Sequence, residues 1–114
     1  MQIKEEIRGD VAVLYLKGNL MGGPEGMEVH EKVKSLLKDK ITKIVIDLSK
    51  VKWMNSSGLG ILMACLTSVQ NAGGKMKISS ATEKIKNLFM ITKLITIFET
   101  YENTDRAVAS FQGE

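Results

Sequence analysis

Short apolar runs of β-prone residues open the chain and recur along it. Ile3–Ile7 and Val11–Leu16 are two such runs, and the Arg8-Gly9-Asp10 segment between them is typical of a hairpin turn. We therefore expect the first two strands to pair antiparallel. Further on, Ile44-Val45-Ile46 is a continuous β-branched run, which suits a parallel strand that is buried on both faces.

Between these runs, apolar residues recur every three or four positions, which is the spacing of one helical face. The first helix follows a glycine-rich loop, and Pro24 suits its first turn. The second helix begins after Asn55 and ends near Gly73, where glycine can close a helix. The inward positions of the four predicted helices are Val29, Val33, Leu36 and Leu37, then Leu59, Leu62, Met63, Leu66 and Val69, then Ile85, Leu88 and Phe89, and finally Ala107, Val108 and Phe111.

Local signals place the remaining boundaries. Lys75–Ile78 alternates as a half-buried strand, and Ser80-Ala81-Thr82-Glu83 matches a capping box before the third helix. Leu94–Phe98 is a further β-prone segment, and Asn103-Thr104 caps the last helix. Strands that alternate with helices after an opening hairpin predict an α/β fold, a mixed β-sheet with its helices packed on one face. We expect one domain that spans residues 1–114.

Composition and charge narrow the classes of function. With 44% hydrophobic and 25% charged residues, the chain has the composition of a soluble globular protein. Its apolar runs fall far short of the ~20 residues of a membrane span, and its start lacks the apolar core of a signal peptide, so we expect a cytoplasmic protein. The net charge of +3 is small, and the lysines between positions 32 and 43 alternate with acidic residues and have no aromatic neighbours. We therefore expect no nucleic-acid interface.

Residue types that support catalysis or metal binding are scarce. A catalytic serine needs a base, and the single histidine, His30, lies in a different predicted helix with no evident acid partner. One histidine and one cysteine cannot build a metal site from the usual soft ligands. Gly58 and Gly60 are not followed by the lysine and hydroxyl of a phosphate-binding loop. We expect neither an enzyme nor a cofactor.

The most distinctive stretch runs from Asp47 to Gly60, where an apolar strand leads into a polar turn and directly into a helix. Asn55, Ser56 and Ser57 stand at the N-terminus of that helix, where free backbone N–H groups and the helix dipole favour negative charge. One interpretation is structural, because asparagine and serine are ordinary helix caps. The other is a docking surface, because a second row of small, partly apolar residues is predicted beside the sheet-facing stripe, at Gly58, Ile61, Cys65 and Ser68.

These residues carry a family resemblance. The sequence Asn55-Ser56-Ser57-Gly58-Leu59-Gly60, after the Ile44–Leu48 strand, resembles the D-S-S-G-L-G phosphorylation motif of STAS domains, specifically the bacterial anti-sigma-factor antagonists. The likeness continues through Asn71-Ala72-Gly73-Gly74, the segment Ile85–Phe89 and the segment Leu94–Phe98, and therefore covers nearly the whole chain. The family usually has aspartate where this chain has Asn55.

The resemblance implies a function. Proteins that look like this one bind a serine-kinase anti-sigma factor, which itself holds ATP, and thereby free a sigma factor until the kinase phosphorylates them. It implies that Ser56 is the phosphoacceptor, with Ser57 as second choice and a phosphatase as an optional further partner. An alternative is a STAS accessory subunit of a transport system, where the same surface binds an ATPase or a permease. The predicted partner-binding residues are Asn55, Ser56, Ser57, Gly58, Gly60, Ile61, Cys65 and Ser68.

Overall fold

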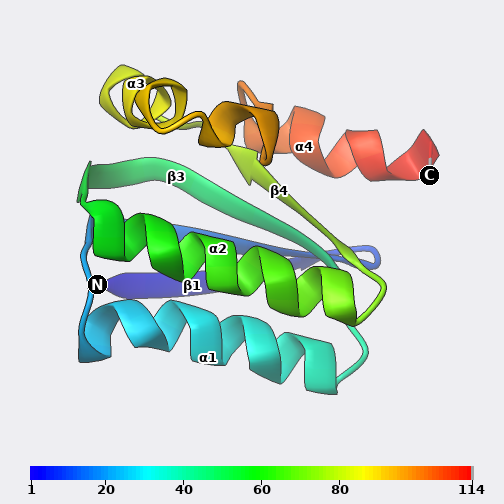
Figure 1. Cartoon of the computed structure of the whole chain (residues 1–114). Helices are drawn as coiled ribbons and strands as arrows, with labels where there is room; N and C mark the ends of the chain where they lie inside the picture. The colour runs from blue at the N-terminus through cyan, green and yellow to red at the C-terminus, as the bar shows by residue number, and fades with distance from the viewer. Residues whose placement is uncertain (114) are drawn as a thin grey trace.

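A mixed five-stranded sheet with the strand order β1-β2-β3-β4-β5 forms the centre of the computed structural model, which describes residues 1–113 (Figure 1). β1 and β2 pair antiparallel, and each later strand pairs parallel with the strand before it. The predicted hairpin and the predicted mixed α/β sheet are therefore confirmed. The strands are β1 Gln2–Arg8, β2 Val11–Leu20, β3 Lys43–Met54, β4 Lys75–Ser79 and β5 Glu99–Tyr101.

Helices connect the parallel strands, as a parallel pair requires. α1 and α2 lie side by side across the sheet, and their first turns are at the same end of the molecule, on the left of Figure 1. Pro24 opens α1, as predicted from its fixed backbone angle. The helices are α1 Pro24–Lys38, α2 Ser56–Asn71, α3 Glu83–Ile91 and α4 Thr104–Ser110, with 3₁₀ turns at Leu94–Thr96 and Phe111–Gly113.

The larger core lies between the sheet and the first three helices. Alternate strand residues, such as Leu14 on β2 and Ile46 on β3, point towards it and are fully buried. The predicted inward stripes of α1 and α2 supply Val29, Val33 and Leu62, which are also fully buried. Each Å² of apolar surface that this core removes from water stabilises the fold by about 25 cal/mol. Its burial is therefore the main favourable contribution to the free energy of folding.

The last helix departs from the prediction that all helices pack on one face. α4 lies on the opposite face, where Ala107 and Phe111 pack with Val11, Val13 and Val45. These three valines alternate with residues of the larger core, so both faces of the sheet are apolar at this end and both need a cover.

Two local predictions in the second half are wrong. Leu94–Phe98 is not a strand, because a 3₁₀ turn at Leu94–Thr96 directs Phe98 into the core, where its ring stacks on Phe89 at 5.5 Å between centroids. The strand β5 begins only at Glu99. The cap of α3 is Thr82 rather than the first residue of the predicted capping box, since the Thr82 side chain accepts a hydrogen bond from the backbone N–H of Ile85.

Candidate functional site

The polar turn after β3 forms the tip of α2. β3 ends at Met54, and the Asn55 side chain accepts a hydrogen bond of 2.8 Å from the backbone N–H of Gly58. Asn55 is therefore the helix cap, which satisfies one of the free N–H groups. Ser56 is the first helical residue, is exposed, and makes no side-chain hydrogen bond to any residue in the range 1–113. Its hydroxyl is not needed to cap the helix.

Close backbone contacts hold this turn in place. A Cβ atom added at Gly58 would collide with the carbonyl oxygen of Leu20, the last residue of β2. A Cβ atom at Gly22 would lie 2.8 Å from the Cβ atom of Ser57. The first turn of α2 thus rests directly on the end of β2 and on the loop that follows it, and both contacts require glycine. The hydroxyl-bearing turn is therefore closely packed against the end of β2.

The predicted second row of α2 is not an accessible surface. Gly58, Ile61 and Cys65 are buried, so the prediction that they contact a partner directly is wrong. The physical reason is α1, which packs along this side of α2 so closely that a Cβ atom at its Gly26 would collide with Ile61. Burial also raises the pKa of the Cys65 thiol to about 12, which disfavours the reactive thiolate at neutral pH.

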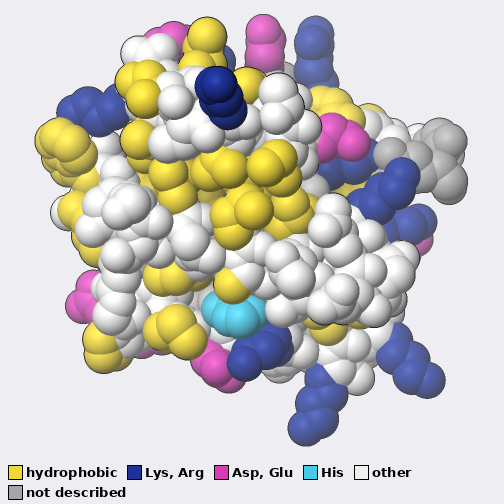
Figure 2. Space-filling view, in the orientation of Figure 1, with side chains coloured by type: hydrophobic (Ala, Val, Ile, Leu, Met, Phe, Trp, Pro, Cys, Tyr) yellow, Lys and Arg dark blue, Asp and Glu magenta, His cyan; other side chains and the backbone are white. Residues whose placement is uncertain are grey.

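Ser68 is the one member of that row that stays partly exposed. Its hydroxyl lies 3.0 Å from Nε2 of His30 on α1, so both side chains are engaged with each other. Figure 2 shows the histidine at the surface between α1 and α2. The pair joins the two helices, which is a structural role.

Four of the eight predicted contact residues remain accessible at the tip of α2. Asn55, Ser56, Ser57 and Gly60 are all exposed, and a Cβ atom at Gly60 would meet nothing within 4 Å. The first turn of α2, which lies wholly within the described residues, contains no acidic side chain. The positive end of the helix dipole at this tip is therefore not neutralised within the helix.

A neighbouring apolar surface was missed by the sequence analysis. Trp53 is 53% exposed, and the Lys84 ammonium of α3 lies 3.8 Å from the centroid of its ring. Trp53, Leu88 and Ile91 line a depression of about 480 Å³ between the end of β3 and α3. Figure 2 shows hydrophobic side chains gathered over the region between α2 and α3. Strict alternation from Val51 would turn Trp53 inward, but the register shift between Gly18 and Asn19 of β2, opposite Val51 and Trp53, reverses it.

The described structure shows neither a metal-binding cluster nor a membrane-spanning helix. Within residues 1–113, no group of three or more histidine, cysteine, aspartate or glutamate side chains is arranged to hold a metal ion. Over the same residues, none of the helices combines the length and apolar character that crossing a membrane requires. The turn at the tip of α2 and the apolar depression beside it are the features that suit a protein partner.

Comparisons with known proteins agree with this architecture. The anti-sigma F factor antagonist of Paenibacillus polymyxa is 23% identical over 112 residues, which cover 98% of this chain and 96% of the relative. A crystal structure from Thermotoga maritima, provisionally assigned as an anti-sigma factor antagonist, is 25% identical with a TM-score of 0.84, and the match covers 95% of this chain and 92% of that one.

A second similar structure is that of the anti-sigma factor antagonist SpoIIAA. Its unphosphorylated form gives a TM-score of 0.77 at 16% identity, over 99% of this chain and 100% of that one. The phosphorylated form of Bacillus SpoIIAA gives a TM-score of 0.72 at 15% identity, over 96% and 99% of the two chains. At these identities the likeness establishes the shared fold. Because the STAS domain model also matches residues 2–107, the chain belongs to the STAS domain family, as its central motif indicated.

Proposed function

We propose that this protein is an anti-sigma factor antagonist that binds a serine-kinase anti-sigma factor in the cytoplasm and is switched off by phosphorylation of Ser56. The observation that carries the proposal is the exposed Ser56 hydroxyl at the uncovered positive tip of α2, with no hydrogen-bond partner in residues 1–113. The name of the Paenibacillus polymyxa relative supports the class of partner. SpoIIAA, which shares the fold, is known in phosphorylated and unphosphorylated forms.

A phosphate on Ser56 suits the fold of this protein. It would add about −1.5 to −2 charges and several acceptor oxygens at a helix N-terminus. The helix dipole and the free N–H groups stabilise an anion there by ~0.3–1 kcal/mol, so we expect the domain to remain folded. The modification instead destabilises the complex. Burying the phosphate against the partner without a counter-charge should cost more than ~1.4 kcal/mol, which corresponds to a tenfold loss in affinity.

Ser57 is the weaker candidate for the modification. Both serines are exposed. The Cβ atom of Ser57, however, lies so close to Gly22 that an added Cβ atom at Gly22 would be only 2.8 Å away. A phosphate on Ser57 would have to pass this loop, whereas no described contact restricts Ser56. Ser56 is therefore the stronger candidate for the phosphoacceptor.

The docking surface that we propose combines the tip of α2 with the apolar depression beside it. Asn55, Ser56, Ser57 and Gly60 supply the polar part, and Trp53, two residues before Asn55, begins the apolar part. An exposed tryptophan beside a polar rim is a frequent centre of binding energy in protein interfaces. In this arrangement Gly58, Ile61 and Cys65 support the surface from beneath.

The direct test is phosphorylation by the cognate kinase. After incubation with the kinase and ATP, mass spectrometry should find one phosphate on the peptide that carries Ser56. Ser56→Ala should abolish this modification, and the matched control Ser57→Ala should retain it. A wild-type protein that stays unmodified in the presence of an active kinase would reject the switch.

The partner itself can be identified by co-purification. We expect the wild-type protein to recover an ATPase domain of the histidine-kinase type, and Ser56→Asp to recover less of it. Recovery of a transport ATPase or a permease instead would favour the accessory subunit of a transport system, the alternative that the motif also allows.

A further inference from the structure

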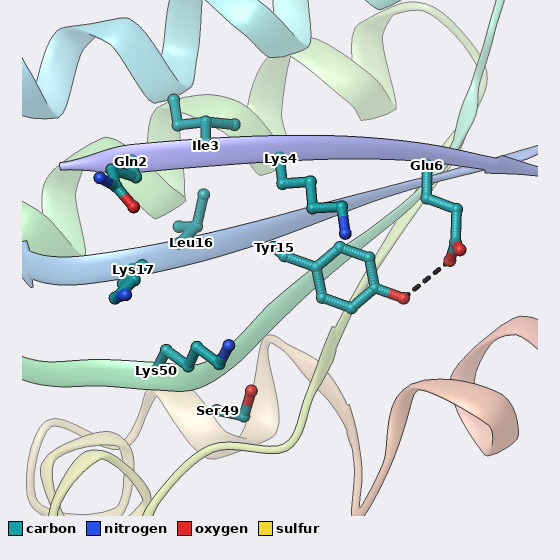
Figure 3. Close-up of a pocket in the computed structure, with 9 residues that line it drawn as sticks. All are labelled: Gln2, Ile3, Lys4, Glu6, Tyr15, Leu16, Lys17, Ser49 and Lys50. Carbon is teal, nitrogen blue, oxygen red and sulfur yellow. Dashed lines mark hydrogen bonds between the residues drawn. The ribbon is translucent and has the colours of Figure 1, made fainter.

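The second face of the sheet carries an open depression away from α4. It has a volume of about 670 Å³, which lies within the usual range of ~300–1,000 Å³ for small-molecule sites. Figure 3 shows the side chains that line it, which come from three neighbouring strands. Those that matter here are Lys4 and Glu6 from β1, Tyr15 and Lys17 from β2, and Ser49 and Lys50 from β3.

Three of these side chains are lysines that form no salt bridge within residues 1–113. Lys4, Lys17 and Lys50 make no ion pair within 4 Å and no side-chain hydrogen bond to any of residues 1–113. In Figure 3 the Lys4 and Lys50 side chains extend towards the Tyr15 ring, from opposite sides of it. The depression is therefore bordered by positive charge around one aromatic side chain.

The single acidic group of the depression is already satisfied. The Glu6 carboxylate accepts a hydrogen bond of 2.6 Å from Arg8 Nε and one of 2.7 Å from the Tyr15 hydroxyl. These bonds hold the pKa of Glu6 below its usual range. Arg8 is bound in turn by Asp105 of α4 at 2.7 Å. Glu6 is thus paired mainly with Arg8, and of the three lysines only Lys4 contributes to lowering its pKa.

The strand register places two of the lysines directly beside each other. Lys17 of β2 and Lys50 of β3 are register partners, and Lys4 of β1 is the register partner of Tyr15. Like charges that face each other on adjacent strands destabilise a sheet. An anion bound between Lys17 and Lys50 would reduce this repulsion. The strands would hold the two lysines at a fixed spacing for binding it.

We propose that this depression binds a small organic anion with at least two phosphate or carboxylate groups. The anionic groups would lie between Lys17, Lys50 and Lys4, and the body of the ligand would lie against the Tyr15 ring. Lysine ammonium groups donate hydrogen bonds to phosphate and to carboxylate oxygens alike. These lysines therefore select a ligand by its negative charge and do not distinguish a phosphate from a carboxylate. The site lies on the sheet face opposite α2 and is independent of Ser56.

The test is a titration followed by NMR of the ¹⁵N-labelled protein at low ionic strength. The probes are inorganic pyrophosphate for phosphate groups and citrate for carboxylate groups. We expect saturable binding of at least one probe with a Kd of ~1 mM or lower, with the largest shifts at the amides of Tyr15, Lys17 and Lys50. The better probe identifies the acid type. Absence of saturable binding by both, or shifts centred on other surfaces, would overturn the proposal.

Matched charge removal separates a defined site from general attraction. Lys17→Gln with Lys50→Gln should weaken binding of the responsive probe about tenfold. Lys38→Gln with Lys93→Gln removes the same charge from exposed positions of α1 and of the turn after α3, and should weaken it less than twofold. Equal weakening by the two double variants would contradict a defined site. Each single variant, Lys17→Gln and Lys50→Gln, repeats the test if a double variant folds poorly, and Ser56→Asp should leave affinity unchanged within twofold.

Discussion

The first turns of α2 and α4 begin in the same way and are used differently. Each helix is capped by an asparagine, Asn55 or Asn103, whose side chain accepts a hydrogen bond of 2.8 Å from the backbone N–H three residues later. Each asparagine is followed by a hydroxyl residue, Ser56 or Thr104. Thr104 is 7% exposed, whereas Ser56 is exposed on the surface.

The difference lies in what surrounds the hydroxyl. Thr104 donates a hydrogen bond of 2.6 Å to the buried carboxylate of Asp47, and Ser79 therefore donates to Thr104 at 2.6 Å. Asp47 also accepts two bonds from Ser49. This network joins α4 to β3 and β4, while the Ser56 hydroxyl bonds to nothing in residues 1–113. The same local sequence feature therefore supports the packing of α4, whereas at α2 its hydroxyl is exposed.

The largest contrast should come from placing the same charge at both helix starts. Thr104→Asp would put a second carboxylate against Asp47 in a buried site, and we expect it to lower the free energy of unfolding by at least ~3 kcal/mol. Ser56→Asp should change that free energy by less than ~1 kcal/mol, because the tip of α2 is exposed and favours an anion. Urea unfolding of both variants measures this difference.

Ser56→Asp also tests the proposed interface. Its affinity for the anti-sigma factor should fall at least tenfold, about 1.4 kcal/mol, as measured by titration calorimetry. Ser56→Ala is the control and should bind like the parent. If Ser56→Asp binds as tightly as the parent, charge at this tip does not control docking.

The next effect concerns how α2 is held on the sheet. Gly58→Ala should destabilise the protein by about 3 kcal/mol, because the new methyl group would collide with the Leu20 carbonyl and force α2 to shift. Gly60→Ala is the matched control in the same helix, where a methyl group meets nothing, and it should stabilise by ~0.5–1 kcal/mol. Equal effects of the two substitutions on the urea midpoint would show that the contact at Gly58 yields easily.

A smaller effect is expected when the two hydroxyls are removed. Thr104→Val would leave the Asp47 carboxylate and the Ser79 hydroxyl short of a partner, at a cost of ~2 kcal/mol in the free energy of unfolding. Ser56→Ala removes a group without a partner and should change that free energy by less than ~0.5 kcal/mol. Thermal and urea unfolding measure both, and a large cost at Ser56 would mean that its hydroxyl has a structural role.

The smallest effect should come from charging the two caps. Asn55→Asp keeps the capping bond and adds a negative charge at a helix start without acidic residues, so we expect a gain of ~0.5 kcal/mol at neutral pH. Asn103→Asp should gain less, because Asp105 already lies in the first turn of α4. The gain at Asn55 should decrease in high salt and on acidification through the aspartate pKa, and a gain that ignores salt would not be electrostatic.

Local signals predicted the parts of this molecule that local interactions determine. The hairpin at Gly9, the cap at Asn103 and the turn at Asn55 follow from the preferences of a few adjacent residues, and the structure confirms all three. The hydrophobic pattern likewise predicted the inward stripes of α1 and α2. For the candidate site, the position of Ser56 at a helix tip was predictable from the capping sequence, but its exposure was not, because Thr104 follows the same kind of cap and is buried.

Features that depend on distant segments were not predictable in this way. Ile61 and Cys65 look like a free row along α2 until α1 is known to cover them. Trp53 faces outward because of register shifts that involve β2, and α4 covers the second face because Val11 and Val13 need burial there. The separate fates of Ser56 and Thr104 depend on Asp47, which is distant from Thr104 in the sequence.

Chemical modification of the buried Cys65 thiol can report when the folded structure opens. Cys65 is the single cysteine of the chain, and it is fully buried, so a reagent cannot reach it while α1 covers α2. Burial also raises its pKa, which disfavours the reactive thiolate. A thiol reagent can therefore modify it only during separation of the two helices or during global unfolding. When closing is faster than modification, the labelling rate gives the free energy of that opening. The free energy of exposing Cys65 can thus be measured in the native protein without any introduced probe.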